Sequence, residues 1–323
     1  MMSTDQSVQD IAEAPLSANV SLRERRFPRR TGGELAALEW APAKHAEQAP
    51  TWLALHGWLD NAASFSRLAP LLCERLGIRL IAIDMVGHGL SSPLGEHGDY
   101  AVWDYCHDVI EALEGLYDEG LPRAPVTVMA HSLGAAVSGQ VAAALPEYIA
   151  RLVLIDGIGA LATPASEVVD QLRRGLLARH AQPVRRAATR RAHYRHVEDA
   201  VAARVAGGVT PIDADTARPI VERNLEVLED GGLRLRSDRR LLRPSLMRYT
   251  PEQVLALLAA LTQPVLLIEG EQGILTIRHE AQQARDAVKR LERRVLPGGH
   301  HLHLEPPHVA AVADAIVEWI SSH

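Results

Sequence analysis

The chain has 323 residues, of which 47% are hydrophobic and 23% are charged, and its formal net charge is −6. This composition is close to that of average soluble globular proteins, which excludes a mainly disordered or fibrous chain. The acidic balance argues against nucleic acid as the main partner, because phosphate binding favours a basic surface. The two cysteines are too few for a disulfide framework and indicate a reducing compartment.

The amino-terminal region shows no targeting signal. Residues 1–20 contain neither a basic segment nor an apolar core of the kind found in signal peptides, and no run of 18 apolar residues occurs in the chain. We therefore expect no transmembrane segment, a cytoplasmic location, and a loose arm over residues 1–20. The sequence leaves the oligomeric state open.

Short apolar runs and helical repeats alternate along the chain. Buried strands are predicted at 51–55, 80–83, 126–129, 152–155 and 264–268. Apolar residues at helical spacing predict helices at 65–72, 102–116 and 309–320. Strands that alternate with helices indicate an α/β fold with a mostly parallel, doubly wound sheet.

The alternation stops after residue 154 and resumes at residue 264. A loop of that length would be improbable, so this region needs its own helices. We expect a core at 21–159 and 256–323, and an inserted helical cap at 160–255.

The cap has an uneven charge distribution. Its first half contains nine arginines, at Arg173, Arg174, Arg179, Arg185, Arg186, Arg190, Arg191, Arg195 and Arg204. Its second half contains Asp213, Asp215, Glu222, Glu226, Glu229 and Asp230. We interpret these charges as paired, solvated helix faces. The alternative is a basic docking site for an anionic substrate or a membrane surface.

The segment VTVMAHSLGAAVSG predicts a strand, a sharp turn and a helix, with Ser132 in the turn. This is the context of a nucleophilic serine, whose strained backbone presents the hydroxyl above the sheet. Residues two before and two after that serine must be small, and Ala130 and Gly134 satisfy this. Ala130 departs from the common G-x-S-x-G pattern by a single methyl group.

A serine nucleophile needs a general base, and His300 is the candidate. It follows two glycines in VLPGGHHLHLEPPHVA, in a loop between a short strand and the final helix. The nearby His301, His303 and His308 have no accompanying cysteine or carboxylate cluster with metal-ligand spacing, so we expect no metal. We expect His301 and His303 to be surface residues or core residues with their polar atoms satisfied.

The segment LALHGWLDN supplies candidate oxyanion donors. Gly57 permits a close backbone approach after a strand, so the amides of Trp58 and Leu133 can both face a developing oxyanion. We also expect the side chains of Trp58 and His131 to contact substrate.

Together, HGWLDNAASF, IDMVGHGLSS, AHSLGA, LVLIDG, PVLLIEGEQG and GGHHLHLE resemble the α/β-hydrolase superfamily. The segments YRHVEDAVAARV and LEDGGLRLRSDRRL are similar to those of serine hydrolase-like proteins within it. The resemblance implies a serine triad covered by a cap, and no cofactor. It also implies that Asp84, in the second motif, belongs to the structural scaffold.

The third triad member departs from the pattern of the superfamily. There, G-x-x-D after the seventh strand usually supplies the acid, whereas Gly273 stands at that position here. Two candidates remain. We prefer Asp156, because some relatives place the acid after the sixth strand, and we keep Glu271 as the alternative.

These assignments predict a serine hydrolase that cleaves a carboxylic ester or a related acyl compound through an acyl-enzyme. The substrate is a small molecule. An acyltransferase or thioesterase with the same triad is an alternative. A hydrolase-like binding or signalling protein with an incomplete triad is another, because the usual acid is missing at Gly273.

Overall fold

The computed structural model describes residues 18–44, 46–180, 193–207 and 210–323. Of the arm expected over residues 1–20, residues 1–17 lie outside this described part, and Val20 already begins the first strand. No helix of the described residues is long and apolar enough to cross a membrane.

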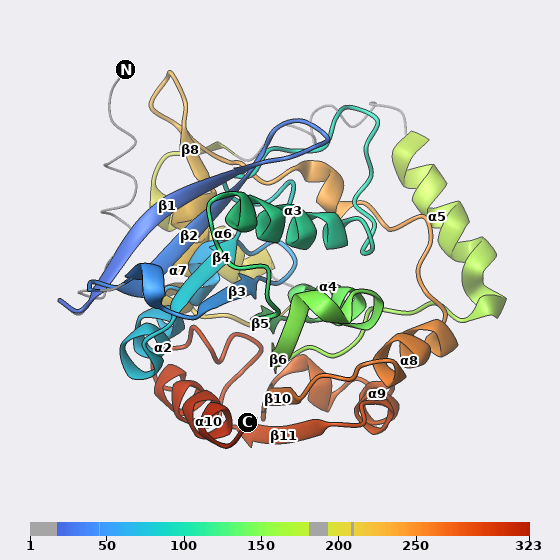
Figure 1. Cartoon of the computed structure of the whole chain (residues 1–323). Coiled ribbons are helices and arrows are strands. Elements are labelled where there is room, and N and C mark those ends of the chain that lie inside the picture. The colour runs from blue at the N-terminus through green and yellow to red at the C-terminus, as the bar shows by residue number, and fades with distance from the viewer. Residues whose placement is uncertain (1–17, 45, 181–192, 208–209) are drawn as a thin grey trace.

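An eight-stranded sheet runs through the centre of the molecule in the order β1-β2-β4-β3-β5-β6-β10-β11 (Figure 1). The strand β2 pairs antiparallel with both β1 and β4, and every later pair is parallel. The mostly parallel sheet predicted from the sequence is therefore confirmed. Its strands are β1 (Val20–Pro28), β2 (Glu34–Pro42), β3 (Thr51–Leu55), β4 (Arg79–Ile83), β5 (Val126–His131), β6 (Ile149–Ile155), β10 (Val265–Gly270) and β11 (Leu291–Leu296).

Helices cover both faces of this sheet. The side chains of α2 and α10 form one buried apolar cluster with one face, and those of α3, α4, α8 and α9 form a second cluster with the other. Parallel strands need this double cover because both faces of such a sheet are apolar. The covering helices are α2 (Leu68–Leu76), α3 (Tyr105–Asp118), α4 (Leu133–Ala144), α8 (Pro251–Ala259), α9 (Ala281–Ala287) and α10 (Val309–Ser322).

Between β6 and β10, the described residues form three further α-helices and a small sheet. A helical cap was expected here, and the antiparallel sheet β7-β9-β8 is an addition. The boundary expected at residue 255 falls inside α8, which packs on the core, so we propose a boundary before Pro251. The elements of this insertion are α5 (Val168–His180), β7 (His193–Tyr194), α6 (Val197–Gly207), α7 (Ala214–Asn224), β8 (Leu225–Val227) and β9 (Leu233–Leu235).

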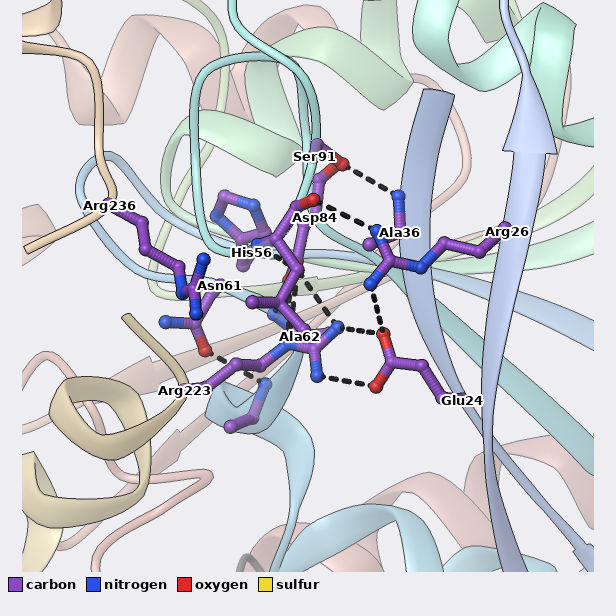
Figure 2. Close-up of polar contacts among 12 residues, drawn as sticks. Glu24, Arg26, Ala36, His56, Asn61, Ala62, Asp84, Ser91, Arg223 and Arg236 are labelled. Atoms are coloured by element: carbon purple, nitrogen blue, oxygen red, sulfur yellow. Dashed lines mark hydrogen bonds and ion pairs between the residues drawn. The ribbon is translucent and has the colours of Figure 1, made fainter. Parts of the chain in front are cut away.

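Buried ion pairs join α7 of the insertion to the core (Figure 2). The guanidinium of Arg223 donates to both carboxylate oxygens of Asp84, at 3.0 Å, and to Glu24 of β1, at 2.9 Å. Asp84 follows β4 and also accepts hydrogen bonds from the backbone of Ala62, at 2.7 Å, and Leu90, at 2.8 Å. These contacts confirm that Asp84 belongs to the structural scaffold.

The charge of Asp84 depends on this arginine. Burial disfavours the ionised carboxylate, but the charge and hydrogen bonds of Arg223 outweigh burial and lower the pKa of Asp84. Both side chains are fully buried. Removing one partner of such a pair is therefore costly, because it leaves the other charge buried alone.

We predict that Arg223→Met lowers the free energy of unfolding by about 3–5 kcal/mol, measured by urea denaturation at neutral pH. The pKa of Asp84 is lowered in the folded state, so its stabilising contribution is present above its unfolded pKa of about 3.9 and is lost as the pH falls below it. The difference between the variant and the wild type should therefore shrink toward acidic pH.

The matched control is Arg75→Met, because Arg75 pairs with Asp314 at the surface, where the two side chains are 38% and 61% exposed. This control should lose less than about 1 kcal/mol. Equal losses in the two variants would contradict the role given to the buried pair.

Candidate active site

Ser132 lies in a strained turn between β5 and α4. Its φ of 50° and ψ of −109° are unfavourable for a residue with a side chain. The turn is held by hydrogen bonds from the Ser132 amide to Ile155, at 3.1 Å, and from the Gly134 amide to His56, at 3.1 Å. A Cβ atom on Gly134 would lie 2.3 Å from the carbonyl oxygen of Leu55, so only glycine fits at this position. This geometry matches the strand, turn and helix predicted around Ser132.

His300 forms a buried hydrogen bond with Asp156. The distance from Nδ1 of His300 to Oδ2 of Asp156 is 2.6 Å, and the two residues are 7% and 0% exposed. Asp156 follows β6, and Oδ2 also accepts a hydrogen bond from the backbone of Ile274, at 2.8 Å. These contacts hold the histidine ring with its other nitrogen, Nε2, directed away from the carboxylate.

The structure also accounts for the glycine at position 273. A Cβ atom on Gly273 would lie 2.2 Å from Oδ1 of Asp156. The Asp156 carboxylate therefore occupies the space that a side chain on Gly273 would need. Glu271, the alternative acid, is exposed, and its backbone amide donates to Leu296 of β11. Of the two candidate acids, only Asp156 is brought to the His300 ring.

His131 lies beneath the candidate site and does not line it. Its side chain is fully buried, so the substrate contact expected for it does not fit the structure. Its Nε2 donates to the backbone carbonyl of His300 at 2.9 Å, and the two rings have centroids 4.5 Å apart. Because His131 directly precedes Ser132, this bond holds the His300 loop beside the turn that carries the serine.

Asp60 completes a buried polar cluster on the other side of His131. Its Oδ2 lies 3.5 Å from Nδ1 of His131 and 3.1 Å from Nε2 of His301. Burial disfavours the ionised carboxylate, but the charge of His301 and its hydrogen bond hold the pKa of Asp60 well below its usual range. Burial and the charge of His300 lower the pKa of His131 to about 4, so its ring is neutral at neutral pH.

The set of Asp60, His131 and His301 is the one group of described residues with spacing that could hold a metal ion. Arg204 of α6 lies 3.7 Å from the second Asp60 oxygen, and its positive charge opposes a further cation there. We therefore describe the cluster as a hydrogen-bonded network. His301 and His303 are buried, but each has an Nδ1 atom without a partner, so the expectation of fully satisfied core residues holds only in part.

The candidate oxyanion donors occupy two loop positions. Leu133 is the first residue of α4, where backbone amides have no acceptor within the helix. Trp58 follows β3 by three residues, and its indole Nε1 donates to the carbonyl of Leu241 at 3.1 Å. The indole is 40% exposed and borders a cavity, as expected for a residue that walls a pocket.

Sequence reasoning missed the contributions of Asp60 and Gly273. Asp60 lies three residues after Gly57 in a loop that was already assigned to the site, so its position in that loop was an available signal. The role of Gly273 depends on its contact with a residue 117 positions away in the chain, which no local pattern shows.

Comparison with known proteins agrees with this geometry. The family described as alpha/beta hydrolase fold matches residues 50–307. A serine hydrolase-like protein of Dictyostelium discoideum is 31% identical over 301 residues, which cover 90% of this chain and 79% of the relative.

Two solved structures are similar over most of the chain. A hypothetical protein from Pseudomonas aeruginosa has a TM-score of 0.81 and 37% identity, and the match covers 92% of this chain and 99% of that one. The thioesterase domain from the curacin biosynthetic pathway has a TM-score of 0.72 and 24% identity, covering 92% and 99%, which shows the shared fold. The chain therefore belongs to the α/β-hydrolase fold family and, within it, to the serine hydrolase-like proteins.

Proposed function

We propose that this protein is a serine hydrolase that cleaves a carboxylic ester or a related acyl compound, with Ser132, His300 and Asp156 as its triad. The observation that carries the proposal is the 2.6 Å contact between His300 and Asp156, in a loop that His131 ties to the serine turn. This contact favours a complete triad over the alternative of a binding protein that lacks the acid.

Each triad member has a distinct task. Nε2 of His300 removes the proton from the Ser132 hydroxyl as its oxygen attacks the acyl carbon. The carboxylate of Asp156 accepts a hydrogen bond from the N–H group at Nδ1 of His300. This bond fixes the tautomer of the ring and stabilises the imidazolium that forms.

The amides of Trp58 and Leu133 are proposed to hold the oxyanion of the tetrahedral intermediate. The intermediate collapses when His300 donates its proton to the leaving alcohol, which leaves the acyl group on Ser132. His300 then activates a water molecule that releases the acid and restores the serine. A thiol leaving group, or an alcohol that replaces the water, would give the thioesterase or acyltransferase reaction with the same residues.

We predict that Ser132→Ala and His300→Ala each lower kcat/KM on p-nitrophenyl esters by about 10³-fold or more, because triad members act as one unit. Steady-state kinetics across a series of acyl chain lengths measures this loss. The control is His279→Ala, which removes an exposed histidine and should keep the wild-type rate. Activity within tenfold of the wild type in either triad variant would exclude the assignment.

A second prediction concerns the acid and the glycine that faces it. Asp156→Asn should lower kcat by about 10²- to 10⁴-fold, and Glu271→Gln by less than about tenfold. Gly273→Asp alone should also be impaired, because its Cβ atom would clash with Asp156.

The double variant Asp156→Gly with Gly273→Asp should recover part of the lost activity. It removes the clash and places a carboxylate in the space beside His300, and glycine suits the φ of 40° at position 156. Greater loss in Glu271→Gln than in Asp156→Asn would move the acid to the loop after β10.

A further inference from the structure

A cavity of about 350 Å³ lies beside Trp58, at the meeting of α5 with the segment that precedes α8. Its lining is strongly basic and contains no carboxylate. The residues around it are Trp58, Gln171, Arg174, Leu242, Arg243, Pro244 and Arg248.

Among the described residues, no carboxylate pairs with the three arginines of this cavity. Arg174 donates to the side-chain amide of Gln171 at 2.9 Å, which leaves its charge uncompensated. Burial and the charge of Arg174 lower the pKa of Arg248, so these two guanidinium groups repel each other across the cavity. Burial and the charge of Arg243 likewise lower the pKa of Arg179, which is itself paired with Asp99.

The sequence that directly follows α5 is also basic. Residues 181–192, which follow α5 and lie outside the described part, include four arginines and neither aspartate nor glutamate. Two other arginines of the insertion do meet carboxylates, since Arg204 lies near Asp60 and Arg223 pairs with Asp84. The three arginines of the cavity differ from these two in having no carboxylate partner among the described residues.

The cavity and the proposed reaction centre share one residue, Trp58. The backbone amide of Trp58 is a proposed oxyanion donor, whereas its indole lines the cavity. The indole is held in place by its hydrogen bond to Leu241, which directly precedes Leu242 and Arg243 of the cavity lining. A group bound by the arginines would therefore lie beside the side chain of a residue whose backbone belongs to the proposed oxyanion hole.

We propose that this cavity binds a carboxylate or phosphate group carried by the substrate, so that the natural substrate is an acyl compound with a second, negatively charged end. This inference rests on the proposed hydrolase function. Guanidinium groups bind carboxylate and phosphate through paired hydrogen bonds, and the Trp58 ring supplies an apolar wall for the chain between the two ends. Of the described arginines among the nine noted in the sequence, only Arg174 lines this cavity, and we assign it the docking role that was the alternative to a solvated helix face.

The test compares two esters of equal chain length. One is p-nitrophenyl hexanoate, and the other is the mono-p-nitrophenyl ester of adipic acid, which ends in a carboxylate. Wild-type enzyme should prefer the adipate half ester by about tenfold or more in kcat/KM, and Arg248→Gln and Arg174→Gln should each reduce this preference by about 10- to 100-fold, mainly through KM. Arg173→Gln, an exposed arginine of α5 outside the cavity, should keep the preference.

Calorimetric titration of the Ser132→Ala variant with adipate and with phenyl phosphate gives a readout that does not depend on catalysis. Either anion should bind to the Ser132→Ala variant, and this binding should be lost in the Ser132→Ala, Arg248→Gln double variant. The anion that binds more tightly identifies a carboxylate or a phosphate as the natural group. Absence of hydrolysis of both esters would overturn the proposed function, whereas the titration would still test the cavity. Hydrolysis of both esters without preference, together with no binding of either anion, would overturn the anion site alone.

Discussion

The space beside the His300 ring admits one carboxylate, and the arrangement of the candidate site follows from which strand supplies it. Asp156 reaches this space from the end of β6, and its Oδ1 lies where a side chain on Gly273 would begin. Because β6 and β10 are parallel neighbours, their carboxyl ends meet at one edge of the sheet. An acid from either strand can therefore serve the same histidine, but two cannot be present together. The glycine at 273 is thus a consequence of the aspartate at 156.

The second constraint is the buried network beneath the triad. His131 directly precedes Ser132, donates to the His300 backbone and faces Asp60 in the loop that also carries Trp58. One neutral ring therefore connects the proposed nucleophile, base and oxyanion loops. Asp60 in turn lies near Arg204 of α6, and Asp84 binds Arg223 of α7. The same insertion that carries the basic cavity is thereby fastened to the loops that would perform the chemistry.

The sequence predicted the central parallel strands of the core well, because buried parallel strands are continuous apolar runs, and it predicted α2, α3 and α10 from their helical spacing. It did not predict the antiparallel strands β1 and β2 or the helices α8 and α9. It was less informative for the insertion, where β7, β8 and β9 have two or three residues each and leave no periodic signal. The turn at Ser132 and the loop at His300 were recognisable from local residue types. Local residue types could not decide between Asp156 and Glu271, since that choice depends on how β6 and β10 lie side by side. The substrate contact expected for His131 does not fit the structure, because its ring is fully buried and donates a hydrogen bond inside the protein.

The central claim is that Ser132 is activated by a histidine that Asp156 orients. Covalent labelling with a fluorophosphonate probe tests it most directly, because rapid reaction requires an activated serine and no knowledge of the natural substrate. The modified residue is identified by mass spectrometry of peptides from the labelled protein. We expect rapid modification at Ser132 alone, and slow modification of the folded Asp156→Asn variant at neutral pH. A folded wild-type protein that stays unlabelled, or that is labelled at another serine, would exclude this triad.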